Sequence, residues 1–262
     1  MRVTSLILAV SLILAPSLAA QVAECTDASF MGVYGLHSSG AFRSGTSNWL
    51  LASVGRLQSY GDQTGIMTEV ISSNGTIIRR TATVGYLVNT DCTLSVTIRY
   101  PDGSVTGMEG TLVDNGREAL LIQTEPAGAA VVSSFRKVGG LAVNGCTTGD
   151  LRGTYGMTTP GAGEILSGSG AGPFAVVSTI YADGEGGFTQ TQIAIRGGLL
   201  QRSVTAGTYQ MAADCTGTLS FGSGASQQAA DFVLVDDSNE IRLLTTDDGA
   251  VTPAFLVRRV RR

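Results

Sequence analysis

The chain contains two copies of one sequence pattern, and this repeat constrains its fold more than any other feature. The copies match at offsets of 121 to 123 residues, a drift too small for chance similarity. The matched segments are Cys25-Thr26 and Cys146-Thr147, Gly32-Val33-Tyr34-Gly35 and Gly153-Thr154-Tyr155-Gly156, Arg80 and Arg202, and Tyr86…Asp91-Cys92-Thr93 and Tyr209…Asp214-Cys215-Thr216. We therefore expect one domain at residues 21–138, a linker at 139–145 and a second domain at 146–262.

The four cysteines of the chain could form disulfides in three ways. The repeat selects one of them, because Cys25 and Cys92 occupy the same two places as Cys146 and Cys215. We expect one disulfide in each domain. A metal site is not expected, since no CxxC spacing occurs and His37 is the only histidine.

The first 20 residues follow the order of a signal peptide. Arg2 precedes an apolar run at 6–15, and small residues that suit a cleavage site follow Pro16. The run is too short to span a bilayer, and no later segment is long enough. We expect a secreted protein, extracellular or periplasmic if the host is Gram-negative, without stable membrane insertion.

Composition excludes one class of partner. Without Arg2 the mature chain holds 16 basic and 21 acidic residues, and it has no basic cluster suited to nucleic acid. Four of the arginines fall at 258–262, where the repeat aligns them with Arg136-Lys137 and so favours a strand end. Oligomeric state cannot be predicted from these features.

Alternating apolar and polar residues dominate both copies. Leu94, Val96 and Ile98 alternate with polar residues, which predicts a strand with one buried face. We expect further strands at 66–71, 76–88, 119–124, 188–196, 201–211, 231–236 and 240–245, separated by turns such as Asn74-Gly75. The fold class is therefore all-β, with two tandem antiparallel barrels. We favour barrels over sandwiches because closure removes exposed strand edges.

The pattern Cys-x6-Gly-x-Tyr-Gly followed by Tyr-x4-Asp-Cys-Thr resembles a family of secreted tandem-repeat proteins that mostly lack an assigned function. The second copy shows the pattern best, in Gly207-Thr208-Tyr209 and Asp214-Cys215-Thr216-Gly217-Thr218. The first copy departs from it at Leu94, which stands in place of Gly217. The overall pattern is also similar to calycin-type barrels, which include lipocalins and allene-oxide-cyclase-like and dirigent-like proteins. This resemblance implies lipocalin-like binding of an apolar small molecule or a cyclisation that needs no cofactor.

The sequence carries no catalytic or cofactor motif. A Ser-His-Asp site would have to use His37, whose counterpart in the second copy is Thr158. The glycine-rich stretch at 168–172 lacks the Lys-Ser/Thr of a phosphate-binding loop, and no Gly-x-Ser-x-Gly is present. Glutamates including Glu69 are candidates for carboxylate chemistry, but nothing in the sequence pairs them. We expect no cofactor and no metal.

The candidate ligand-binding residues are aromatic and basic. Each has an alternative structural interpretation: the repeated tyrosines could pack the core, and the arginines could face solvent. If the arginines instead enter a cavity beside tyrosine hydroxyls, they could hold a carboxylate or polarise a carbonyl. The candidates are Tyr34, Tyr155, Arg80, Arg202, Tyr86, Tyr209, His37 and Trp49, with Asn74 as a glycosylation candidate in a eukaryotic host.

Three functions remain open from the sequence. The first is a secreted protein that binds a small apolar or aromatic molecule in a barrel cavity or in the groove between the domains. The second is a cofactor-independent cyclase or isomerase, and the third is a structural or surface interaction module with filled barrels. Function is expected where the copies differ, at His37, at 41–51 and at 164–173.

Overall fold

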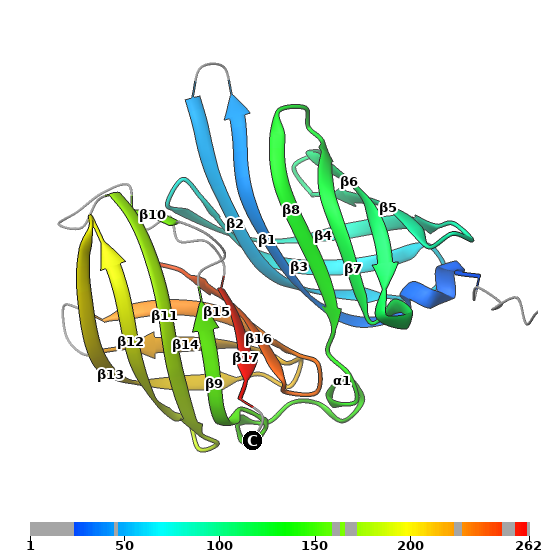
Figure 1. The fold of residues 1–262 in the computed structure, drawn as a ribbon. Coiled ribbons are helices and arrows are strands. Elements are labelled where there is room, and N and C mark those ends of the chain that lie inside the picture. The colour runs from blue at the N-terminus through cyan, green and yellow to red at the C-terminus, as the bar shows by residue number, and fades with distance from the viewer. Residues whose placement is uncertain are drawn as a thin grey trace, which may run out of the picture.

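A computed structural model describes residues 24–44, 47–158, 163–165, 172–222, 227–247 and 255–260. It confirms the all-β prediction, with two closed antiparallel barrels that lie side by side (Figure 1). The predicted signal peptide at 1–20 lies outside the described residues. In the part of the chain described here, no helix is long and apolar enough to cross a membrane.

Barrel 1 closes between its first and last strands, since β1 pairs with both β2 and β8. Its elements are η1 (Asp27–Phe30), β1 (Gly32–Ser44), β2 (Ser47–Ser59), β3 (Thr64–Ser73), β4 (Thr76–Val88), β5 (Thr93–Arg99), β6 (Val105–Val113), η2 (Asp114–Gly116), β7 (Glu118–Glu125) and β8 (Ala129–Lys137). Each strand is antiparallel to its neighbours in sequence, so the chain winds up and down around the barrel.

Barrel 2 repeats this winding, and β9 closes it by pairing with both β17 and β11. The short β10 pairs with β11 as an additional strand. A one-turn helix, α1 (Leu141–Asn144), lies in the predicted linker. The remaining elements are η3 (Thr148–Asp150), β9 (Arg152–Thr158), β10 (Gly163–Ile165), β11 (Gly172–Asp183), β12 (Gly187–Arg196), β13 (Leu199–Met211), β14 (Thr216–Phe221), β15 (Gln228–Val235), β16 (Glu240–Thr245) and β17 (Phe255–Arg259).

Alternation along the strands decides which residues fill each barrel. In β5, Leu94, Val96 and Ile98 are buried in the barrel 1 core, and the residues between them face outward. One end of barrel 1 is closed by Phe30 of η1. Its ring centroid lies 4.6 Å from that of Tyr34 and 5.2 Å from that of Tyr86. Aromatic side chains therefore plug barrel 1 at the end that carries the disulfide.

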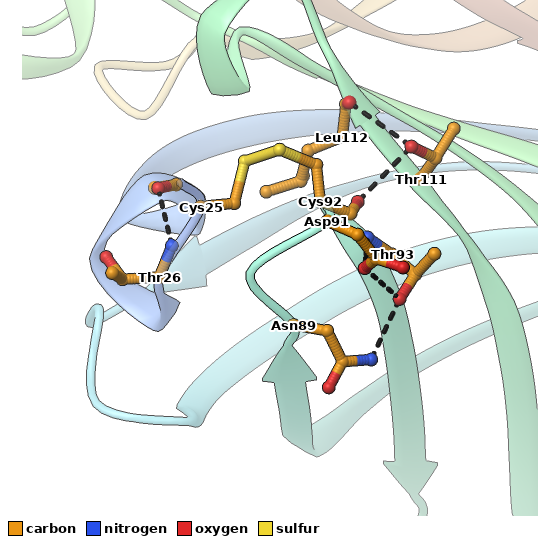
Figure 2. Close-up of a disulfide and its surroundings, with 9 residues drawn as sticks. Cys25, Thr26, Asn89, Asp91, Cys92, Thr93, Thr111 and Leu112 are labelled. Carbon is orange, nitrogen blue, oxygen red and sulfur yellow. Dashed lines mark hydrogen bonds between the residues drawn. A yellow bond between two sulfur atoms is a disulfide. The ribbon is translucent and has the colours of Figure 1, made fainter. Parts of the chain in front are cut away.

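The predicted disulfides are confirmed as Cys25–Cys92 and Cys146–Cys215, one in each barrel region. Figure 2 shows the first, which ties the N-terminal segment to the β4–β5 turn. Cys92 adopts a φ of 67°, and Asp91 stabilises this tight turn by accepting hydrogen bonds from the amide (3.0 Å) and hydroxyl (2.7 Å) of Thr93. The repeated Asp-Cys-Thr motif thus builds a turn.

The barrels pack directly against each other. Ala52 and Val54 on the outer face of β2 form an apolar cluster with Leu244 on the outer face of β16. Gly35 lies in the same interface, where a Cβ atom would come within 2.4 Å of Cγ1 of Val235. A glycine is therefore required at this point of β1 for the close approach of the second barrel.

A buried arginine crosses this interface. The side chain of Arg242 in β16 is 1% exposed, and its Nε donates to Oε1 of Glu240 at 3.0 Å. Its Nη1 donates to the carbonyl oxygen of Gly35 at 3.1 Å and to Oγ of Ser134 at 2.9 Å, and Nη2 lies 3.6 Å from Glu118. Burial lowers the pKa of Arg242, and the two carboxylates oppose this shift. Arg242 thereby connects β16 of barrel 2 to β1, β7 and β8 of barrel 1.

Candidate functional site

A groove of about 690 Å³ runs between the two barrels. Barrel 1 lines it with the outward faces of β2, β3 and β4, and barrel 2 lines it with the end of β13 and with β14 and β15. We call it the inter-barrel groove. Its apolar lining includes Val54, Val70, Met211 and Val233, so the groove has the mixed apolar and polar character that is common in small-molecule sites.

Arg56 lines this groove, and its guanidinium is not fully hydrogen-bonded. Its Nη2 makes a long contact of 3.5 Å with Oε1 of Gln58. Its Nε is buried and has no hydrogen-bond partner among the described residues. A buried donor without an acceptor costs about 1–3 kcal/mol, so an anionic group that lets this guanidinium hydrogen-bond would be favoured.

A second arginine bridges the two walls of the groove. Nη2 of Arg79 in β4 lies 2.6 Å from Oδ2 of Asp231 in β15. The Arg79 side chain is largely exposed, so this ion pair contributes little to stability by itself. It nevertheless holds one cation beside the lining of the groove and joins the two walls there.

The four repeated tyrosines lie in the barrel cores. Burial raises the pKa of Tyr34 well above its ordinary value, and its hydroxyl donates to the carbonyl oxygen of Gly116 at 2.8 Å. Tyr155 donates to the carbonyl oxygen of Ser238, and Tyr209 donates to that of Leu151 at 2.7 Å. The Tyr86 hydroxyl accepts the amide of Gly61 at 2.8 Å. The four tyrosines thus pack the barrel cores, and their hydroxyls hold neighbouring segments through hydrogen bonds with the backbone. This matches the alternative, structural role given to them above.

The two candidate arginines point in opposite directions. Arg80 faces the interior of barrel 1, in alternation with the buried Ala82, whereas Arg202 faces outward and is exposed. Residue Arg79 lies seven places before Tyr86, and Arg202 lies seven places before Tyr209, so the structural counterpart of Arg202 is Arg79. The counterpart of Arg80 is Ser203.

Arg80 belongs to a polar cluster inside barrel 1. Its Nε donates to Oε1 of Glu69 at 2.9 Å, and its guanidinium carbon lies 3.4 Å from the ring centroid of Tyr100. The Tyr100 hydroxyl donates to the same Glu69 oxygen at 2.7 Å. Burial, followed by the charge of Glu69, raises the pKa of Tyr100. The carboxylate and the guanidinium neutralise each other, and this satisfies two charges inside the barrel.

The other candidates lie apart from the inter-barrel groove. His37 is buried on the outer face of β1, Trp49 in β2 is 43% exposed, and Asn74 is exposed in the β3–β4 turn. The segments 41–51 and 164–173, where function was expected, fall partly outside the described residues. Of the sequence candidates, only Arg80 lies in the part of β4 that borders the groove, and its side chain points away from the groove into barrel 1.

Several residues of interest were not candidates from the sequence. Arg56 and Arg79 resemble any outward strand charge, and only the packing of the second barrel gives them a groove. Arg242 did carry a signal, because it interrupts the apolar run Ile241-Arg242-Leu243-Leu244. A charge in a strand whose two faces are otherwise apolar indicates burial with a partner.

None of the known protein-family models matches the chain, and no curated protein matches it either. Among the described residues, no group of three or more His, Cys, Asp and Glu side chains is placed to hold a metal ion.

Proposed function

We propose that this protein is a secreted binding protein that holds a small apolar molecule with an acidic group in the inter-barrel groove. The observation that carries the proposal is the Arg56 guanidinium, whose buried Nε has no partner beside an apolar lining. A carboxylate at Arg56 would gain charge-assisted hydrogen bonds, while the apolar body would contact Val54, Val70 and Met211.

Two further features support a site between the barrels. The volume of about 690 Å³ lies within the range of pockets that hold drug-sized molecules. The contact between barrels is fixed by the Arg242 hydrogen bonds and by the Ala52–Val54–Leu244 cluster, so the walls of the groove are held in place before a ligand arrives. A preformed site loses less free energy to ordering when it binds.

A panel of aliphatic and aromatic carboxylic acids, each matched with its primary amide, tests the proposal. We expect the acids to raise the melting temperature of the purified protein and the amides to have a smaller effect, because only the acids carry the charge that Arg56 would bind. Isothermal titration with the best acid should then give one site per chain.

The variant Arg56→Gln should weaken binding of that acid about tenfold or more, the loss expected when a charged hydrogen bond is removed. The matched control is Arg99→Gln, which changes an exposed arginine of β5 outside the groove. Equal binding by the two variants, or an equal response to acids and amides, would refute the role of Arg56.

A further inference from the structure

The two barrels contact each other through different faces, although they are copies of one fold. Barrel 1 contributes the outer face of β1 to β4, with Val54 in the apolar cluster and Arg79 in the ion pair. Barrel 2 contributes the outer face of β15 and β16, with Leu244 and Asp231 in the same two contacts. In a heterologous contact of this kind, each unit retains an unused copy of the face that the other unit has used.

Cross-strand pairing identifies the unused face on barrel 2. In barrel 1, Tyr34 of β1 pairs with Leu57 of β2, and Val54, which contacts barrel 2, lies three residues before Leu57. In barrel 2, Tyr155 of β9 pairs with Ile180 of β11, so the residue equivalent to Val54 is Val177, three residues before Ile180. The rows of directly paired residues are Val54, Val70 and Arg79 in barrel 1, and Val177, Ile193 and Arg202 in barrel 2.

The same reasoning identifies the unused face on barrel 1. The docking pair of barrel 2 is Asp231 with Leu244, four residues before Val235 in β15. Four residues before the equivalent Val113 in β6 lies Glu109, which pairs with Ile122. Both pairs therefore have an acidic residue on the first strand and an apolar residue opposite it on the second.

The preserved apolar residues are buried where the barrels meet and exposed where no barrel covers them. Leu244 is 0% and Val54 is 2% exposed, whereas their counterparts Ile122 and Val177 are 57% and 53% exposed. Ile193 is 41% exposed. Around Ile122, the exposed Leu120 and Val132 extend the apolar surface beside a hollow of about 550 Å³. Apolar surfaces grouped in this way are typical of interaction sites.

We propose that the chain assembles head to tail with further copies of itself. The β6–β7 face of one copy docks onto the β11–β13 face of the next, as barrel 2 docks onto barrel 1 within the chain. Ile122 then contacts Val177 and Ile193, and Glu109 pairs with Arg202 in the manner of Asp231 with Arg79. In Figure 1, β5 to β7 and β11 to β13 lie on opposite sides of the barrel pair, so each copy can bind a neighbour on each side.

This contact does not involve the inter-barrel groove, and it stands independently of the proposed ligand. Because the two faces differ, repetition of the contact gives a ring or an open array. Charge complementarity supports a second copy as the partner, since one face presents Glu109 and the other presents the exposed Arg202.

Sedimentation velocity of the purified chain over a wide concentration range tests the proposal. We expect species larger than the monomer to increase with concentration. Glu109→Arg and Arg202→Glu should each weaken association about tenfold or more, because each places like charges opposite each other. The chain that carries both changes should associate as the unmodified protein does.

Mixing the two single variants gives the sharpest result. Contacts between two copies of one variant then repel, whereas both contacts between unlike variants join opposite charges, so we expect alternating assemblies and association restored to the level of the unmodified protein. Glu185→Arg, an exposed charge reversal in the β11–β12 turn, is the matched control and should leave association unchanged. A monomer at every concentration, or equal association of all variants, would overturn the proposal.

Discussion

Arg242 should contribute more to stability than any exposed charge of this protein. Its side chain is 1% exposed, yet its guanidinium contacts two carboxylates, two carbonyl oxygens and a hydroxyl. Arg242→Met keeps an unbranched side chain but leaves the carboxylate of Glu240, itself 11% exposed, with only the largely exposed Arg258 at 3.7 Å in place of its buried partner. Removal of one member of a buried ion pair costs about 3–5 kcal/mol, and we expect a loss of that size.

Urea unfolding followed by far-ultraviolet circular dichroism measures this loss. Trp49, the only tryptophan, lies in barrel 1 and reports that barrel through its fluorescence. Because Arg242 joins the barrels, we expect the variant to separate the fluorescence transition from the circular dichroism transition. Arg242→Met combined with Glu240→Gln should lose less than the single variant, since the unpaired carboxylate is then removed.

The matched control is Leu120→Ala, at the place in β7 that corresponds to Arg242 in β16. Leu120 is 46% exposed in the single chain, so at a protein concentration where the chain is a monomer this change should alter the free energy of unfolding by about 0.5 kcal/mol or less. If Arg242→Met costs less than about 1 kcal/mol, or costs no more than Leu120→Ala, the role given to the buried guanidinium is wrong.

Three further predictions concern the barrels and their contact. Cys25→Ala with Cys92→Ala opens a loop of 67 residues and should lower the free energy of unfolding by about 4 kcal/mol in denaturant titrations; a loss below about 1 kcal/mol would contradict it. Gly35→Ala should cost about 1–3 kcal/mol by overpacking the interface, whereas Gly85→Ala, where a Cβ meets nothing within 4 Å, should not. Burial raises the pKa of Asp236, but two arginines outweigh it, and the pKa is lowered overall. Its stabilising effect is therefore fully present above the unfolded pKa of about 3.9 and is lost below it, as the pH falls through the lower folded pKa. Asp236→Asn should thus make stability depend less on pH in this acid range.

Strand pattern and disulfides could be predicted from the sequence because both depend on local spacing. The alternation in β5 identified the buried face of that strand, and the repeat of Cys25 and Cys92 at Cys146 and Cys215 identified the pairing. These features need no knowledge of how the two barrels meet.

The direction of the arginines could not be predicted in the same way. Matching Arg80 to Arg202 by residue type differs by one residue from the match that strand pairing gives. Since side chains alternate between faces, a slip of one residue exchanges the inside of a barrel for its outside. Arg80 accordingly pairs with Glu69 inside barrel 1, while Arg202 is exposed on barrel 2.

The inter-barrel groove could not be predicted from the sequence, for a different reason. It exists only because the outer face of β15 and β16 packs on the outer face of β1 and β2, and one-dimensional patterns describe each barrel separately.

The buried position of Glu69 inside barrel 1 did carry a sequence signal, since Glu69 shares the inward alternation of Met67 and Ile71. Its partner Tyr100 follows the same alternation after Ile98.

The methionine methyl groups offer the most direct test of ligand binding in the groove. Met211 lines the groove, whereas Met67 and Met108 lie in the core of barrel 1 and Met157 lies in that of barrel 2. In a titration of methyl-labelled protein with the best carboxylic acid, nuclear magnetic resonance should show the Met211 signal moving while the three core signals stay in place. Shifts confined to Met67, Met108 or Met157 would place the ligand inside a barrel and contradict the account.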